Sequence, residues 1–374
     1  MNVGARVPSR TKITRVLTLV ALFSCSADSP KKPKEPMGAL PSGTTTAIPE
    51  WLPRHVFAGT STPPVPGEVR LSEVRRLSAG LDVSQTAFDQ RGDTVFFVAT
   101  VRGASRGGLY RVRLAETGAD LGRAAERLTP DSEDVTSLAL FEDRVFYRSA
   151  AGGWSERVDG APRPVDLPKA EFLTFANGEP IALGVAERGD PGSVRTVTFP
   201  MFDVRPSGRQ AVASAPAGWS GPFAGLAPAV SANGALVALG LPDPACFRAE
   251  LPAVARELPC DAAQSVSLFS REGRGKRQVV DVAPHRVVGL AFMSASMSDE
   301  GELCFASDRD RSNFELYSVS TKDRTIERLT FGGGRAPSVS GVSGRIGFAS
   351  HRAGDSADLY VANLGQSRGS REVP

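Results

Sequence analysis

Few residues of this sequence have the types and spacing that catalysis requires. The histidines are His55, His285 and His351, and they are widely separated in the sequence. A Ser–His–acid hydrolase needs a histidine base beside a nucleophile on a sharp turn, and no G-x-S-x-G turn is present. Three dispersed histidines also do not predict a metal triad. The sequence therefore predicts no catalytic residue, no metal site and no cofactor.

Acidic residues are concentrated at Asp308, Asp310 and Glu315. An Asp-x-Asp turn can bind calcium, but a loop site needs five or more oxygen ligands in a defined order. Arg309 and Arg311 interleave with these acids. We therefore expect Asp308 and Asp310 to accept turn amides and to pair with arginine.

Cysteines provide a second candidate chemistry. Cys246 and Cys260 bracket a proline-rich excursion, and an oxidising compartment would favour a disulfide between them. Two free thiols are the alternative. Cys304 lies in an apolar run, which is typical of a small buried core residue. No two cysteines have the C-x-x-C spacing of zinc or redox sites.

The elements that would position these side chains belong to a repeat. GELCFASDRDRSNFELYSVS, which begins at Gly301, returns as GRIGFASHRAGDSADLYVAN, which begins at Gly344. The copies share a signature at a spacing of 43 residues: Phe305 and Phe348, Ser307 and Ser350, Arg309 and Arg352, Tyr317 and Tyr360. A fixed period of about 40–50 residues is typical of propellers and solenoids.

One copy predicts three short strands, at Leu303–Ser307, Phe314–Val319 and Ile326–Thr330, separated by polar turns. Gly332–Gly334 lies between strands with no helix or lysine after it, so it predicts a turn between blades rather than a phosphate loop. Several such units must stack around an axis to bury both of their faces.

The phrases FASDRD, ELYSV and ERLTFGGGRAPSVS resemble the TolB-type β-propeller repeat. The match is close over residues 288–364, weaker over 71–160 and poor over 161–287. We expect an all-β, six-bladed β-propeller over residues 68–364, with seven blades as the alternative if 200–225 contains one more. Arg76-Leu77-Ser78 matches Arg328-Leu329-Thr330 but precedes the first unit, so we expect this N-terminal strand to complete the last blade and close the ring.

The N-terminus has the layout of a leader. Residues 1–25 combine four basic residues with a short apolar core that ends at Leu22-Phe23-Ser24-Cys25. This end resembles a bacterial lipobox, which implies lipid attachment at Cys25, although Phe23 departs from the usual small residue. Ordinary signal cleavage and an uncleaved short anchor are the alternatives.

Residues 26–67 are rich in proline, serine, threonine and glycine and predict a tether. Its apolar interruptions, Trp51-Leu52-Pro53 and Val56-Phe57, are expected to dock on the domain or to contact a partner. Residues 365–374 are expected to form a disordered tail.

The net charge of +3 is too small to imply a nucleic-acid partner. Together with the lipobox-like leader, the resemblance implies a protein of the bacterial cell envelope, lipid-anchored on the periplasmic face of the inner or outer membrane or on the cell surface. We expect a monomer. It would act as a non-catalytic module that binds an envelope protein or glycan at the propeller mouth. The alternatives are a hydrolase or lyase acting on a glycan, lactone or ester at the channel mouth, and a structural filler.

Overall fold

The computed structural model describes most of the unit Ile48–Pro374. The described residues are 60–114, 125–141, 144–158, 161–165, 170–176, 179–184, 186–188, 196–205, 208–215, 229–231, 235–241, 263–270, 277–281, 285–293, 301–310 and 313–365. Over these residues the structure contains no helix that is long and apolar enough to cross a membrane.

All described elements are β-strands, and their antiparallel pairing gives six sheets. The first two sheets run in chain order: β3 (Leu81–Phe88), β4 (Thr94–Val101), β5 (Gly107–Arg113) and β6 (Ala125–Arg127), then β7 (Val135–Phe141), β8 (Arg144–Ser149), β9 (Trp154–Val158) and β10 (Ala161–Val165). The third contains β11 (Ala170–Ala176), β12 (Glu179–Gly184) and β14 (Thr196–Arg205), with β13 (Ala186–Arg188) and β15 (Gly208–Ala215) both paired to β14.

The C-terminal half repeats this plan. The fourth sheet contains β16 (Ala229–Val230), β17 (Leu236–Leu241), β18 (Ser265–Ser270) and β19 (Arg277–Val280). The fifth contains β20 (Val287–Phe292), β21 (Glu302–Ser307), β22 (Glu315–Ser320) and β23 (Ile326–Arg328). The sixth joins β24 (Arg335–Ser340), β25 (Arg345–Ser350) and β26 (Asp358–Leu364) to the N-terminal strands β2 (Leu71–Arg76) and β1 (Thr60–Ser61).

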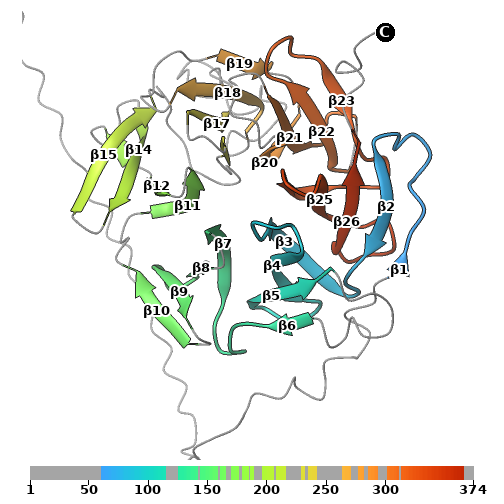
Figure 1. The fold of residues 1–374 in the computed structure, drawn as a ribbon, viewed down its shortest axis with the longest axis horizontal. Coiled ribbons are helices and arrows are strands. Elements are labelled where there is room, and N and C mark those ends of the chain that lie inside the picture. The colour runs from blue at the N-terminus through green and yellow to red at the C-terminus, as the bar shows by residue number, and fades with distance from the viewer. Residues whose placement is uncertain are drawn as a thin grey trace, which may run out of the picture. The chain divides into compact units, whose positions relative to one another are not determined.

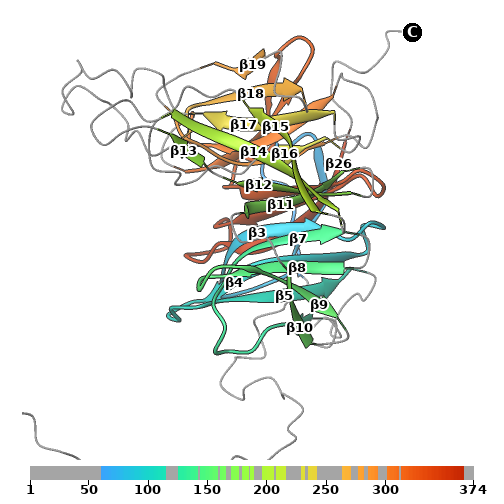
Figure 2. The same cartoon turned by 90° about the vertical axis from the view of Figure 1, so that its left-hand side faces the viewer.

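The sheets contact one another in a closed cycle. One edge strand of each sheet, in the series β3, β7, β11, β16, β20 and β24, touches the edge strand of the next sheet, and β24 touches β3. These strands therefore surround a common centre (Figure 1). The neighbouring sheets β3–β6 and β7–β10 overlap in the view turned by 90° (Figure 2). This is the arrangement of a β-propeller, so the predicted all-β propeller class is confirmed.

Side chains on the innermost strands join neighbouring sheets. The Gln85 amide of β3 donates to the Leu138 carbonyl of β7 and accepts from the Leu138 backbone N–H, both at 2.9 Å. On the other side of β3, the Thr86 hydroxyl lies 2.8 Å from both the Ala336 carbonyl and the Ser338 hydroxyl of β24. Because these bonds satisfy buried polar groups between sheets, they fix the sheets relative to one another.

The apolar runs form the core because each sheet packs between two neighbours. In β21 and β25 five of six residues are buried. The signature phenylalanines and tyrosines stack as cross-strand pairs, with ring centroids 5.6 Å apart for Phe305 and Tyr317 and 5.8 Å apart for Phe348 and Tyr360. Phe97 and Tyr110 form the same pair in the first sheet, at 5.3 Å. The positions that the repeat predicts to be equivalent therefore make the same contact in their two sheets.

Several strands differ from the sequence-based expectation. β1 lies inside residues 26–67, which were expected to be tether, and it pairs with β2. β10 and β13 were not predicted, because Ala161–Val165 contains two prolines and Ala186–Arg188 has three residues. β2 is hydrogen-bonded to β26 along its length.

Removing one stacked ring should test this core. Phe305→Ala deletes a fully buried ring, and we expect the free energy of unfolding to fall by about 3–5 kcal/mol because a cavity remains. Phe331→Ala is the matched control, since the Phe331 side chain is exposed. Urea unfolding followed by circular dichroism measures both, and equal midpoints for the two variants would contradict the assignment of Phe305 to the core.

Candidate functional site

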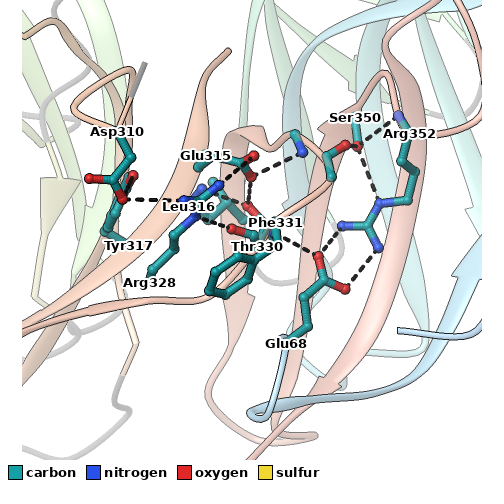
Figure 3. A network of polar contacts seen from close by, with 12 residues as sticks. Glu68, Asp310, Glu315, Leu316, Tyr317, Arg328, Thr330, Phe331, Ser350 and Arg352 are labelled. Atoms are coloured by element: carbon teal, nitrogen blue, oxygen red, sulfur yellow. Dashed lines mark hydrogen bonds and ion pairs between the residues drawn. The ribbon is translucent and has the colours of Figure 1, made fainter. Parts of the chain in front are cut away.

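The Arg-Leu-Ser/Thr element holds the tyrosine strand in place. In the fifth sheet the Arg328 Nε donates to the Thr330 carbonyl at 2.8 Å, and the Thr330 hydroxyl accepts the Leu316 backbone N–H at 2.8 Å (Figure 3). The hydroxyl also donates to Glu315 at 2.6 Å. The arginine thus fixes the turn, and the turn fixes the strand that carries Tyr317.

The same geometry occurs in two other sheets. In the first, Arg127 donates to the Thr129 carbonyl at 3.0 Å and the Thr129 hydroxyl accepts the Leu109 N–H at 3.1 Å. In the sixth, Arg76 on β2 donates to the Ser78 carbonyl at 2.9 Å, and the Ser78 hydroxyl accepts the Leu359 N–H at 2.8 Å. β2 therefore occupies the position in its sheet that β23 and β6 occupy in theirs.

The acidic cluster is engaged in contacts within the fold. Asp308 accepts the Arg286 backbone N–H at 2.6 Å and its Nε at 2.7 Å. Asp310 accepts the Tyr317 hydroxyl at 2.7 Å, and Glu315 accepts Arg328 at 3.0 Å. Asp308 and Asp310 pair with arginine as expected, whereas the amide that Asp308 accepts belongs to Arg286 and not to its own turn. Within the described ranges no group of three or more metal-ligating side chains comes together.

Among the described residues, the ion pair with the least exposed side chains joins Glu68 to Arg352, across 284 positions of sequence. The side chains are 0% and 3% exposed, and Arg352 Nη2 lies 2.9 Å from Glu68 Oε1. Glu68 also accepts the backbone N–H of Phe331 at 3.0 Å (Figure 3). It accepts the backbone N–H of Val65 at 2.9 Å. All of these donors point at one carboxylate, so the segment before β2 is fixed against the fifth and sixth sheets.

Arg70 makes the second anchor of this segment. Its guanidinium donates to both oxygens of Glu302, at 2.5 Å and 3.0 Å, and to Glu327 at 3.2 Å. It also bonds Ser318 and the Gly365 carbonyl. Burial opposes the charge of Arg70, but the two glutamates outweigh it and raise the pKa of the guanidinium. Sequence reasoning missed Glu68 and Arg70, because both precede the repeat and their partners are remote in the chain.

Equivalent signature residues have different surroundings. The Ser350 hydroxyl donates to the Gly332 carbonyl at 3.0 Å, whereas the buried Ser307 hydroxyl has no hydrogen-bond partner in the described structure. Arg352 lies 5.1 Å from the Phe348 and Tyr360 ring centroids and pairs with Glu68. Arg309 lies 5.5 Å from the Tyr317 ring centroid and is exposed.

The two described histidines lie at different depths. His285 is 5% exposed, and its Nε2 has no hydrogen-bond partner in the part of the chain that the structure covers. Burial lowers the pKa of His285, and the Arg309 charge lowers it further, against the opposite effect of Asp308 and Asp310. His351 is exposed in the turn after β25, as expected, with Nδ1 3.2 Å from the Asp355 carbonyl.

The cysteines predicted to carry chemistry, Cys25, Cys246 and Cys260, lie outside the described residues. Cys304 is free and fully buried in β21, and burial raises the pKa of its thiol. The prediction that it is a core residue is confirmed. A buried thiol with a raised pKa is unreactive at neutral pH, so Cys304 is not a nucleophile.

No family model matches this sequence, and neither does any curated protein. Solved structures do match. A gluconolactonase from Xanthomonas campestris is 14% identical, with a TM-score of 0.50 over 82% of this chain and 98% of that one. The likeness is one of fold. At this identity it supports the β-propeller and carries no information about ligand or activity.

Two further structures have lower scores. TolB from Acinetobacter baumannii is 13% identical, with a TM-score of 0.46 over 71% of this chain and 58% of that one. An oligogalacturonate lyase from Vibrio parahaemolyticus is 13% identical, with a TM-score of 0.44 over 78% of this chain and 93% of that one. The chain spans less than two thirds of the TolB structure.

Neutralising the buried carboxylate should loosen the N-terminal segment. We expect Glu68→Gln to lower the free energy of unfolding by about 3–5 kcal/mol, because Arg352 would remain buried without a compensating charge. Asp355→Asn removes the same charge from an exposed pair with Arg102, 3.1 Å apart, and should change little. Urea midpoints measure both, and an unchanged midpoint for Glu68→Gln would show that this ion pair does not stabilise the fold.

The chain has four tyrosines, Tyr110, Tyr147, Tyr317 and Tyr360, and all are held protonated. Burial is the main cause, and for Tyr147 burial together with Glu133 raises the pKa to about 12.

Absorbance at alkaline pH should therefore report the fold. The native protein should show little phenolate near pH 10, where a denatured sample is about half ionised. The tyrosine pKa values are higher in the folded protein than in the denatured one, so the protonated rings stabilise the fold fully below about pH 10. That stabilisation is lost as the pH rises through the folded pKa values. A native titration that overlays the denatured one would contradict burial of these rings.

Proposed function

We propose that this protein is a lipid-anchored β-propeller of the bacterial cell envelope that binds a protein or glycan without catalysing a reaction. The observation that carries the proposal is that the carboxylates of the repeat are bonded to other groups of the fold. Asp308, Asp310 and Glu315 are bonded to arginine, tyrosine or backbone groups of the fold. Carboxylates engaged in this way hold the scaffold, and loops on such a scaffold are suited to recognition.

We infer that the six sheets are six blades and that β2 closes the ring. Two observations support this architecture. Arg76 and Ser78 reproduce the contacts of Arg328 and Thr330, and β2 pairs with β26 of the last unit. A sheet completed by both ends of the chain leaves no open seam between the first and last units.

The anchor rests on the sequence. The basic and apolar leader, followed by Cys25, supports diacylglyceryl attachment, and residues beyond it supply a tether. The proposed location is the periplasmic face of the inner or outer membrane or the cell surface, with the protein as a monomer. A disulfide between Cys246 and Cys260 would be compatible with that compartment.

Affinity capture from native envelope tests the function. We expect the full chain to retain one saturable envelope partner and to carry an acyl mass on Cys25, read by mass spectrometry. Cys25→Ala should lose the acyl mass and move to the soluble fraction, while still binding that partner in solution, because the partner surface belongs to the propeller.

A different result would change the conclusion. Turnover in a screen of glycans, lactones and esters, with no captured partner, would replace the binding module by a propeller-based hydrolase or lyase. A wild-type chain without an acyl group, found in a soluble pool, would remove the anchor and leave the binding proposal to the capture result.

A further inference from the structure

The repeat gives two equivalent arginines, and one of them already holds a carboxylate. Arg352 clasps Glu68 with Nη1 at 3.2 Å and Nη2 at 2.9 Å. The backbone N–H of Phe331, directly before Gly332–Gly334, completes the cradle at 3.0 Å. The sixth sheet therefore contains a complete example of how this fold binds a carboxylate.

The carboxylate is presented by a short turn of peptide. The Glu68 N–H donates to the Val65 carbonyl at 3.0 Å, and the Val69 N–H donates to the Gly67 carbonyl at 2.8 Å. The turn presses on the connection before β24, because a Cβ on Gly332 would lie 3.0 Å from Val65 Cγ2 and 3.2 Å from Arg352 Cβ. The carboxylate that Arg352 binds therefore belongs to a glutamate, Glu68, on a short turn of the chain.

Arg309 occupies the equivalent position in the fifth sheet without that carboxylate. It stacks on Tyr317, as Arg352 stacks on Tyr360, with 5.5 Å and 5.1 Å from the guanidinium to the ring centroid. Both nearby acids have other partners, since Asp308 pairs with Arg286 and Asp310 accepts from Tyr317. Within the described residues Arg309 makes no ion pair.

A second polar group lies at the same place. His285 is in the connection that leads into β20, as Gly332–Gly334 leads into β24. It is 5% exposed, and its Nε2 lacks a hydrogen-bond partner among the described groups. His285 directly precedes Arg286, whose backbone N–H bonds the Asp308 carboxylate at 2.6 Å, and Asp308 directly precedes Arg309, so the two residues belong to the same corner of the sheet. A buried ring nitrogen without a partner is costly unless a ligand supplies one.

We propose that Arg309 and His285 form a binding site for a glutamate or aspartate side chain of a partner peptide, which they receive as Arg352 receives Glu68. This inference rests on the proposed binding function and specifies the chemistry of the partner, an acidic peptide side chain. Arg309 supplies a guanidinium fork that matches a carboxylate, and His285 supplies the second polar contact. An acidic peptide fits better than a uronate because the occupant of the equivalent site is a peptide turn.

The test titrates the full chain with an acetylated and amidated peptide of residues 65–70, VPGEVR, followed by calorimetry. We expect Arg309→Gln, or replacement of the peptide glutamate by glutamine, to weaken binding about 10-fold or more. Arg91→Gln is the matched control, because Arg91 is an exposed arginine in the β3–β4 turn, and it should leave the affinity unchanged. Equal affinities for the Arg309 and Arg91 variants would overturn the site.

Two further readouts separate the possible failures. On adding the peptide, the imidazole resonances of His285 should shift while those of His351 stay in place, and the converse would overturn the assignment. A galacturonate oligomer that displaces the peptide at equal concentration would overturn the peptide as ligand. If Arg309→Gln leaves envelope capture unchanged, this site is rejected and the proposed function stands. If no envelope partner is captured but Arg309→Gln weakens binding of the peptide, the proposed function is rejected and the site stands.

Discussion

The ion pair of Glu68 with Arg352 is the contact on which the docking of the segment before β2 against the fifth and sixth sheets depends. Both side chains are shielded from water, so separating them would leave two uncompensated charges in a medium of low polarity. The pair holds the segment before β2 against two sheets, and Arg70 repeats the arrangement a short distance away with Glu302 and Glu327.

The repeated units share the hydrogen bonds of the scaffold and differ in the side chains that lie beside them. The Arg-Leu-Ser/Thr turn has the same hydrogen bonds in three sheets. Around it the partners change: Glu315 faces Arg328, whereas Gly108 stands at the same place in the first sheet, where a Cβ would lie 3.0 Å from Arg127 Nε. Differences between otherwise equal units are therefore where recognition can arise.

The sequence was most informative where the repeat is written twice. The 43-residue spacing of Phe305, Tyr317 and their counterparts predicted equivalent positions, and the structure adds that each pair of rings is stacked. The propeller class followed from the same period. Glu68 escaped prediction because its partner is remote in the chain and a single buried glutamate gives no periodic signal. The unequal surroundings of Arg309 and Arg352 escaped it for the same reason, since the segment that carries Glu68 has no counterpart in the repeat.

The pairing of β2 with β26 also determines when the molecule can be completed. The Leu359 N–H bonds the Ser78 hydroxyl across 281 positions, so this sheet cannot form until the residues of β26 have left the ribosome. Earlier units can collapse locally, but their last neighbour is still missing. Pairing of β2 with β26 therefore comes after the earlier sheets have been synthesised, and until then β2 exposes an edge that other chains could pair with.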